Sequence, residues 1–301
     1  MTQAVSPELV AELEKEILKR TLSQLSNNYI LSLNRLSVYR KRFKRDAIEY
    51  LFDEKSLYAQ FKREMIDRFL MEHHKSWFNL HPIVREIGLQ KLRQNSNSIQ
   101  EAHRIASRYY TRHFQAQELK GWETLGGYFV EARYHLVKAE EQDDFKKIAI
   151  PFQDYIFSTL KANSCIPNSA EELDERIAVL SALLETPGPK NLEYHLARLF
   201  QARNQRNDLV RALNHAHRSK SNKSVVPWLL CSELHYQMGQ LYQAVNLLKK
   251  GIDSIPPEKD LASLFVKCSH FLAQMKKREE AIILLKQGIE IIPSDKQLAS
   301  L

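Results

Sequence analysis

The chain has 301 residues, 44% of them hydrophobic, so it is long enough for two or three domains with buried cores. Its 8 glycines and 10 prolines leave little turn material for a many-stranded sheet and favour long helices joined by short loops. The chain has 44 basic and 36 acidic residues, and its net charge of +8 does not by itself identify a charged ligand. No apolar run approaches the ~20 residues that a membrane span needs.

The N-terminal residues predict two helices. Residues 6–8, Ser-Pro-Glu, provide a capping hydroxyl, a proline for the first helical position and an acid near the positive end of the helix dipole. Leu9, Leu13 and Ile17 then repeat every four residues, which indicates the apolar side of a first helix, and residues 29–38 predict a second. Because no basic region followed by an apolar one precedes them, we expect a cytoplasmic protein without a membrane partner.

Two further helices and one hairpin are predicted next. Apolar residues mark one side of a short helix over 46–52 and of a longer helix over 57–70, which Ser56 is placed to cap. Residues 70–80 predict two short strands around a polar tip. We expect strand nowhere else in the chain.

A His-Pro step follows the second strand within residues 77–87, Trp-Phe-Asn-Leu-His-Pro-Ile-Val-Arg-Glu-Ile. Pro82 suits the first position of a helix, and the apolar residues after it repeat on one helical face. This stretch resembles the end of the winged-helix module in STAND-type signalling NTPases, whose pattern is approximately Leu-His-Pro-Leu-Val-Arg-Glu. In that family the histidine contacts the bound nucleotide. The resemblance therefore implies a nucleotide-sensing role for His81 when an NTPase domain is present.

Three more segments resemble parts of the same family. Together with residues 77–87 they occur along the chain in the order that the family has. Residues 31–40, Leu-Ser-Leu-Asn-Arg-Leu-Ser-Val-Tyr-Arg, resemble the Leu-x-x-Leu-Ser-Val-Phe-Arg pattern that opens the winged helix. Residues 102–110 and 130–139 resemble helices that follow it in bacterial members. The resemblance implies a winged-helix module in the regulatory half of a STAND protein. The NTPase domain itself is absent, because the chain contains no Gly-x-x-x-x-Gly-Lys-Ser/Thr loop.

Polar, periodless stretches suggest where the domains meet. One such stretch lies near residue 95 and another near residue 220, and apolar periodicity between them predicts helical hairpins. We therefore predict a winged-helix module with its N-terminal helix at 1–95, a central helical region at 96–220 and repeats at 221–301.

The C-terminal segment contains an internal repeat. Four pairs of identical residues are 37 positions apart: Cys231 with Cys268, Ala244 with Ala281, Gly251 with Gly288, and Pro256 with Pro293. The pattern resembles tetratricopeptide repeats, whose unit is about 34 residues, with a linker extended by three residues. Small residues are expected where paired helices approach closely. The predicted fold class is thus all-α, a winged-helix module followed by helical hairpins and a tetratricopeptide-like α-solenoid.

This resemblance implies a protein-binding surface on the first helix of each repeat. In the family these helices line a concave face, and the matching residues here are Leu229, Glu233, Tyr236, Val266 and His270. An equally weighted interpretation treats Leu229 and Val266 as ordinary packing residues. The expected partner is a protein, together with an NTPase domain in the same or another chain.

No catalytic group, cofactor or metal site is expected. The paired acids at 140–144 lie in a polar helix junction, where no apolar surroundings shift a pKa toward acid–base work. The adjacent His73 and His74, and the pair His215 and His217, lack chelating geometry because their rings leave the backbone on different sides. The three widely spaced cysteines are expected to be reduced packing residues.

One basic cluster allows a competing function. It consists of Arg40, Lys41, Arg42, Lys44 and Arg45. These residues fit DNA phosphates or the surface of a missing NTPase domain, although the helix over 57–70 mixes basic with acidic residues, which disfavours a tight DNA footprint. We therefore predict a non-catalytic regulatory module whose winged helix couples nucleotide state to conformation and whose repeats bind a protein or signal. The alternative is a DNA-binding winged-helix regulator that recruits partners through its repeats.

Overall fold

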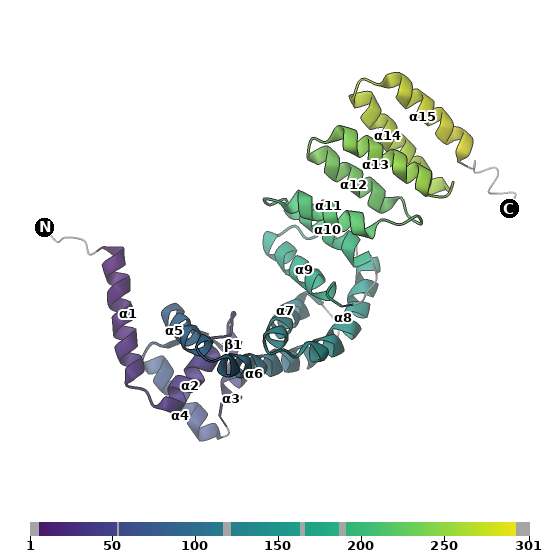
Figure 1. Ribbon diagram of the computed structural model, residues 1–301. Coiled ribbons are helices and arrows are strands. Elements are labelled where there is room, and N and C mark those ends of the chain that lie inside the picture. The colour runs from purple at the N-terminus through teal and green to yellow at the C-terminus, as the bar shows by residue number, and fades with distance from the viewer. Residues whose placement is uncertain (1–5, 53, 117–121, 163–165, 187–190, 293–301) are drawn as a thin grey trace. The chain divides into compact units, whose positions relative to one another are not determined.

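The computed structural model describes residues 6–52, 54–116, 122–162, 166–186 and 191–292 (Figure 1). These residues form fifteen α-helices, one short 3₁₀ helix and one three-stranded sheet, so the predicted predominance of helix is confirmed. None of the described helices is long and apolar enough to cross a membrane. The chain divides into two compact units, residues 1–152 and 153–301. The division into three domains at residues 95 and 220 stays a prediction.

The described residues up to Arg93 form five helices and the sheet. Ser6 accepts a hydrogen bond from the backbone N–H of Leu9 at 3.3 Å and caps the first helix as predicted. Ser56 does not cap α4 as predicted, because the helix already begins at Lys55 and Glu54 holds the N-cap position. The Ser56 hydroxyl donates to the Glu54 carboxylate at 3.3 Å. The elements are α1 (Pro7–Ser23), α2 (Asn27–Leu36), β1 (Phe43–Lys44), α3 (Arg45–Glu49), α4 (Lys55–Asp67), β2 (Met71–His74), β3 (Trp77–Leu80) and α5 (Pro82–Arg93).

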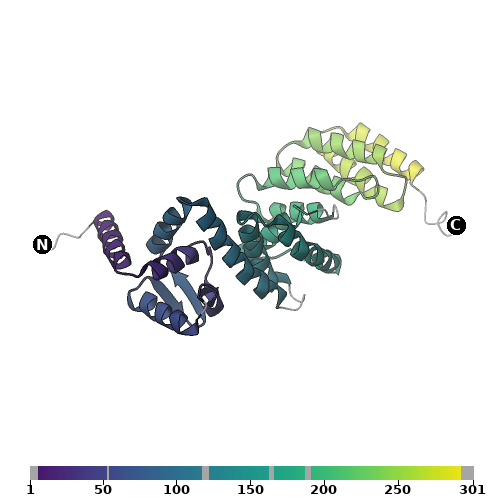
Figure 2. The ribbon, with the colours of Figure 1, turned by 60° about the horizontal axis from the view of Figure 1, so that its bottom comes forward.

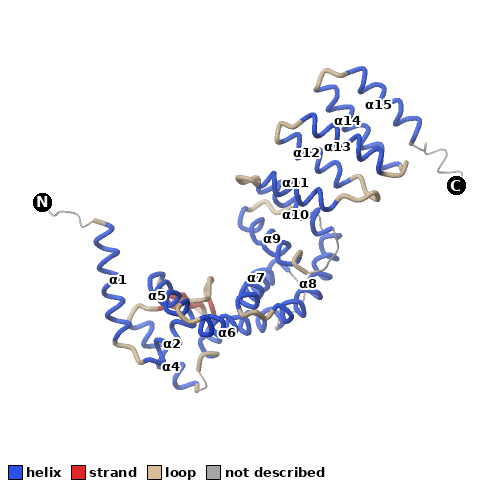
Figure 3. Tube along the Cα trace, in the orientation of Figure 1, coloured by secondary structure: helices blue, strands red, loops and turns tan. Residues whose placement is uncertain are grey.

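The sheet is antiparallel with the strand order β1-β3-β2. Its strands are coloured red in Figure 3. β2 and β3 form the predicted hairpin, in which Met71 lies opposite Leu80. The prediction that strand is confined to residues 70–80 is wrong, because β1 pairs with β3. Two residues are too short to show an alternating pattern, so the sequence did not predict β1. Tertiary contacts stabilise the pairing, among them the buried stacking of Phe43 on Phe78, with centroids 6.4 Å apart.

Large apolar side chains from α4 and the hairpin form the interior of residues 6–93. Figure 2 shows the sheet beside the helices of this segment. Phe61, Met65 and Leu70 are fully buried. α2 packs against α5, where a side chain at Gly88 would meet Cβ of Ser37 at 2.9 Å. A glycine is therefore needed for this close approach.

Two long helices follow within the first unit, α6 (Ser96–Gln115) and α7 (Trp122–Lys138), and they pack against each other. Asn95 caps α6, because its side-chain oxygen accepts a hydrogen bond from the backbone N–H of Ser98 at 3.1 Å. The Tyr109 hydroxyl accepts from the backbone N–H of Lys44 at 3.0 Å and joins α6 to β1. The boundary between the two units falls within α8 (Gln142–Ala162).

The described helices of the second unit pack in sequence, each against the next, in an arrangement typical of helical repeat proteins (Figure 1). Ser169 caps the first of them by accepting from the backbone N–H of Glu172 at 3.2 Å, and a serine followed three residues later by a glutamate is the sequence pattern of a capping box. The helices are α9 (Ala170–Leu183), α10 (Asn191–Arg203), α11 (Asp208–Ser219), α12 (Val226–Gln237), α13 (Leu241–Ser254), α14 (Ala262–Gln274) and α15 (Arg278–Ile291).

The repeat spacing of 37 has a packing cause in the pairs α12–α13 and α14–α15. A side chain at Gly251 would meet the ring of Trp228 at 3.1 Å, and one at Gly288 would meet the ring of Phe265 at 2.9 Å. Each aromatic ring of a first helix thus packs on a glycine of the second. The predicted close approach of paired helices at small residues is confirmed.

Candidate functional site

The five predicted partner-binding residues lie on α12 and α14, which contact each other within the second unit. We call these residues the α12–α14 surface. Tyr236 and Val266 are 40% and 60% exposed, and His270 is also exposed, whereas Leu229 and Glu233 are half-buried. Leu229 packs against the buried residues of the repeats. The structure therefore places Leu229 among the packing residues and Val266 at the solvent.

Contacts between α12 and α14 order this surface. The Glu233 carboxylate accepts from the Lys267 ammonium at 2.6 Å, and this ammonium lies 4.9 Å from the ring centroid of Phe271. The same ring stacks on Tyr236 with centroids 5.0 Å apart and an interplanar angle of 16°. Sequence reasoning missed Lys267 and Phe271, although the opposite charges of Glu233 and Lys267 on the first helices of two neighbouring repeats were a usable signal.

His81 lies at the junction of β3 and α5, where it is the residue before the first helical position. Its Nε2 is 3.1 Å from the Glu14 carboxylate of α1, and its side chain is 23% exposed. Its Nδ1 is buried and has no hydrogen-bond partner among the described residues. The ring therefore sits at a partly open edge, with Nε2 already facing an oxygen anion.

Three of the five residues in the basic cluster already interact within the first unit. The Arg40 guanidinium lies 3.7 Å from the ring centroid of Tyr134, and Lys44 lies 5.2 Å from that of Trp77. Arg45 donates to Glu49 at 2.7 Å. The other two members, Lys41 and Arg42, are exposed. The cluster is thus not a single free basic patch.

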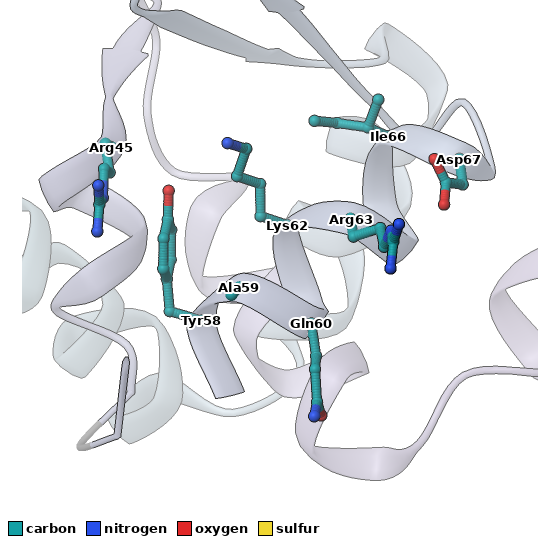
Figure 4. A pocket seen from close by; sticks show the side chains of 8 residues that line it. All are labelled: Arg45, Tyr58, Ala59, Gln60, Lys62, Arg63, Ile66 and Asp67. Atoms are coloured by element: carbon teal, nitrogen blue, oxygen red, sulfur yellow. The ribbon is translucent and has the colours of Figure 1, made fainter. Parts of the chain in front are cut away.

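A surface pocket of about 640 Å³ lies between α3 and α4. Figure 4 shows the Tyr58 hydroxyl between the side chains of Arg45 and Lys62, with Arg63 on the far side of the pocket. That hydroxyl is buried and lacks a hydrogen-bond partner among the described residues. Three cations and one acid, Asp67, line the pocket, so it has the charge to attract an anion.

A buried polar cluster joins the basic segment to α7, and sequence reasoning missed it. Arg40 donates two hydrogen bonds to the Glu131 carboxylate, at 3.1 and 2.9 Å. Glu131 is 2% exposed, and it lies 4.0 Å from Nε2 of the fully buried His135. The Nδ1 atoms of His135 and His103 are 2.8 Å apart, so one donates to the other. We call His103, Glu131 and His135, together with Arg40, whose side chain is 39% exposed, the buried polar cluster.

Burial keeps both histidines of this cluster neutral. It lowers the pKa of His103 to about 4, and the charges of Lys138 and Arg40 act in the same direction. Burial also lowers the pKa of His135 well below its ordinary value, and His103 and Arg40 add to the shift. The ring of Tyr110 stacks on His135 at 5.3 Å. The available sequence signal, which was not used, was the polar residues His103, Glu131 and His135 among the apolar residues of α6 and α7.

Metal-binding and thiol chemistry find no support in the described part of the chain. No three His, Cys, Asp or Glu side chains are grouped there in a way that would hold a metal ion. Cys231 and Cys268 are buried, and burial raises the pKa of their thiols to about 12 and about 11. Cys165 lies outside the described residues.

No family model and no curated protein matches this chain. Among solved structures it is similar to a Signal Transduction ATPase with Numerous Domains protein with a tetratricopeptide repeat sensor from Pyrococcus horikoshii, at 12% identity and a TM-score of 0.29. The match covers 97% of this chain and 47% of that one, so the chain spans about half the length of the similar protein.

Proposed function

We propose that the chain is a non-catalytic regulatory and protein-interaction module of a STAND-type signalling system. Its repeats bind a protein partner, and its winged helix couples the nucleotide state of an NTPase domain to conformation. The α12–α14 surface carries the first part of this proposal. The position of His81 and the motif resemblances between residues 29 and 140 support the second.

The α12–α14 surface combines features that suit a protein partner. Tyr236 offers an exposed aromatic ring already held against Phe271, and Val266 adds exposed apolar area beside it. Aromatic residues held in one rotamer lose little conformational entropy on binding, which is why they are enriched at interfaces. The Glu233–Lys267 pair, about one-third exposed, offers both a donor and an acceptor.

Replacing Glu233 and Tyr236 together with alanine is expected to weaken partner binding at least about ten-fold and to leave the fold intact. Both side chains are partly exposed, and exposed ion pairs contribute little to stability, so the variant should melt within a few degrees of the parent. Affinity purification with quantified recovery measures the effect. The matched control is Tyr242→Ala, which removes a 62% exposed tyrosine from α13. Equal recovery from both variants would remove the α12–α14 surface from the proposal.

A contact between α5 and the basic segment supports a coupling role for the first unit. Arg85, one turn after His81, donates to the carbonyl oxygens of Ser37 at 3.2 Å and Arg40 at 3.4 Å. Arg40 in turn holds Glu131 of α7. A movement of α5 that began at His81 would therefore reach α7 through hydrogen bonds.

His81→Ala is expected to change the melting of the isolated chain little, because the His81–Glu14 contact is partly exposed. In an assembly with an NTPase domain, Nε2 of His81 would donate a hydrogen bond to a phosphate oxygen of the nucleotide, in place of its present contact with the Glu14 carboxylate. Loss of that bond should shift the balance of closed and open states by ~1 to 3 kcal/mol. Nucleotide retention in the assembly is the measurement. Unfolding of the isolated variant with unchanged retention would make His81 a structural residue.

The pocket between α3 and α4 favours a second candidate, binding of nucleic acid by the winged helix. Lys62 and Arg63 lie on the helix before the hairpin, and Arg45 faces them from α3. Duplex DNA binding that weakens steeply with salt and is lost in Lys62→Ala/Arg63→Ala would favour this candidate. Binding unaffected by these substitutions would argue against it.

A further inference from the structure

The pocket between α3 and α4 is bordered by a buried hydroxyl that lacks an acceptor. Tyr58 is only 4% exposed, and its hydroxyl has no hydrogen-bond partner among the described residues. A buried hydroxyl without a partner is unfavourable, so native proteins normally satisfy such groups. Burial raises the pKa of Tyr58, which keeps the proton on the hydroxyl and makes it a donor at neutral pH. The partner that fits this hydroxyl is therefore an acceptor brought by a ligand.

Two cations flank the Tyr58 hydroxyl. Figure 4 shows it between the side chains of Arg45 from α3 and Lys62 from α4. The Arg45 guanidinium carbon lies 5.0 Å from the Tyr58 ring centroid, and the Lys62 ammonium lies 5.6 Å from that of Phe78. Arg45 donates from Nε to Glu49, and its guanidinium has further N–H groups to offer. Both cations end long, flexible side chains, so they can part to admit an anion and close on it.

These three donors match the acceptors of one chemical group. A terminal phosphate presents three acceptor oxygens and carries a charge of about −1.5 to −2 near neutral pH. A phosphodiester has only two free oxygens and a single negative charge. The two positive charges and three donors of Arg45, Tyr58 and Lys62 therefore fit a terminal phosphate better than the backbone of a nucleic acid.

The rest of the pocket suits the body of a small molecule. Its volume of about 640 Å³ lies in the range of small-molecule sites. Ala59 and Ile66 line it and offer apolar contact. Figure 4 shows Arg63 and Asp67 on the far side. The acid there disfavours a second phosphate beside the first, which a nucleic-acid backbone would bring.

We propose that the pocket between α3 and α4 binds a small molecule through its terminal phosphate, which Arg45, Tyr58 and Lys62 hold. The Tyr58 hydroxyl donates to one phosphate oxygen, and the two cations donate to the others and balance their charge. This names a different ligand for the pocket that the second candidate function uses. It requires neither an NTPase domain nor a partner on the α12–α14 surface.

Titration of the full chain with inorganic phosphate tests the proposal. Sodium chloride keeps the ionic strength constant, and backbone amide shifts in NMR spectra report where the ion binds. We expect saturable shifts confined to α3 and α4, with a dissociation constant of about 1 mM, because the free ion lacks the body of the ligand. Dimethyl phosphate, a diester, should bind at least about ten-fold more weakly. Shifts that do not saturate, or equal binding of the two anions, would overturn the proposal.

Tyr58→Phe removes only the hydroxyl. It should weaken phosphate binding about ten-fold, the loss expected for one hydrogen bond to a charged group. Without phosphate the variant should melt at a temperature at least as high as the parent, because the hydroxyl has no partner among the described residues to lose. Tyr242→Phe, at a 62% exposed position in the second unit, is the matched control and should change neither quantity. Unchanged phosphate affinity in Tyr58→Phe, or a lower melting temperature without phosphate, would make the hydroxyl a structural group and contradict the proposal.

Duplex DNA with 5′-hydroxyl ends, which carries only phosphodiesters, separates this proposal from the second candidate function. Lys62→Ala should abolish phosphate binding, whereas Arg42→Ala, at an exposed cation outside the pocket lining, should leave it unchanged. If Lys62→Ala/Arg63→Ala loses duplex binding and phosphate does not saturate the parent chain, the pocket serves nucleic acid and the proposal is wrong. If phosphate saturates the parent, Tyr58→Phe weakens it and the duplex does not bind, the proposal stands and the second candidate fails.

Discussion

Arg40→Ala is expected to destabilise the first unit by about 3 kcal/mol, because it leaves a buried carboxylate without its cationic partner. Glu131 is 2% exposed, and its carboxylate accepts two hydrogen bonds from the Arg40 guanidinium, at 3.1 and 2.9 Å. Amide hydrogen exchange in α7 measures the change locally, which matters because a chain of two units need not unfold in one step. A loss of this size corresponds to roughly 100-fold faster exchange.

A second pair of variants separates charge from packing. Lys41→Ala removes an exposed neighbouring cation and should leave exchange in α7 unchanged. Arg40→Met combined with Glu131→Leu removes both charges and keeps apolar volume, so most of the lost stability should return. If the double variant is as unstable as Arg40→Ala, the loss reflects packing against Tyr134 and the buried charge is not its cause.

Lowering the pH from 7.5 to 5 is expected to cost the first unit about 1 to 2 kcal/mol through His103. Burial lowers the pKa of His103 to about 4 in the folded chain, against 6.5 when exposed. Between these values the unfolded chain binds more protons than the folded one. The stability is therefore complete above pH 6.5 and is lost as the pH falls toward 4, and the lowered pKa of His135 adds to the loss.

Several charged groups act on this histidine pair. Arg40, Arg85 and Lys138 oppose protonation, whereas Glu131 is the one acid of the cluster. The measurement is the pH dependence of amide exchange in α6 and α7 after correction for the intrinsic rate. His103→Leu combined with His135→Leu should flatten that dependence, whatever its effect at neutral pH. His270→Leu, at an exposed position in the second unit, should leave it unchanged. A slope that survives in the double variant would assign the pH dependence to other groups.

Local pattern was enough to predict the helices and the hairpin of this protein. The cap at Ser6 and the β2–β3 hairpin both lie where the sequence placed them. These signals are reliable because they involve neighbours within a few residues, whose contacts follow from backbone geometry alone. The repeat was also visible, because packing of an aromatic ring on Gly251 and again on Gly288 recurs with a constant spacing.

The distant partners of Arg40 and His81 came only from the tertiary structure. Arg40 stood in the sequence as one of five basic residues available to DNA, yet its ion-pair partner Glu131 lies 91 positions further along the chain. The contact between His81 and Glu14 likewise joins separate elements, β3–α5 and α1.

The sequence by itself determined the helical class, the hairpin and the repeat of this protein, because the physics behind those features acts over neighbouring residues. The tertiary structure alone decided the third strand and the buried polar cluster. Those features depend on which distant side chains remove one another from water, and a single sequence carries no periodic trace of such pairs.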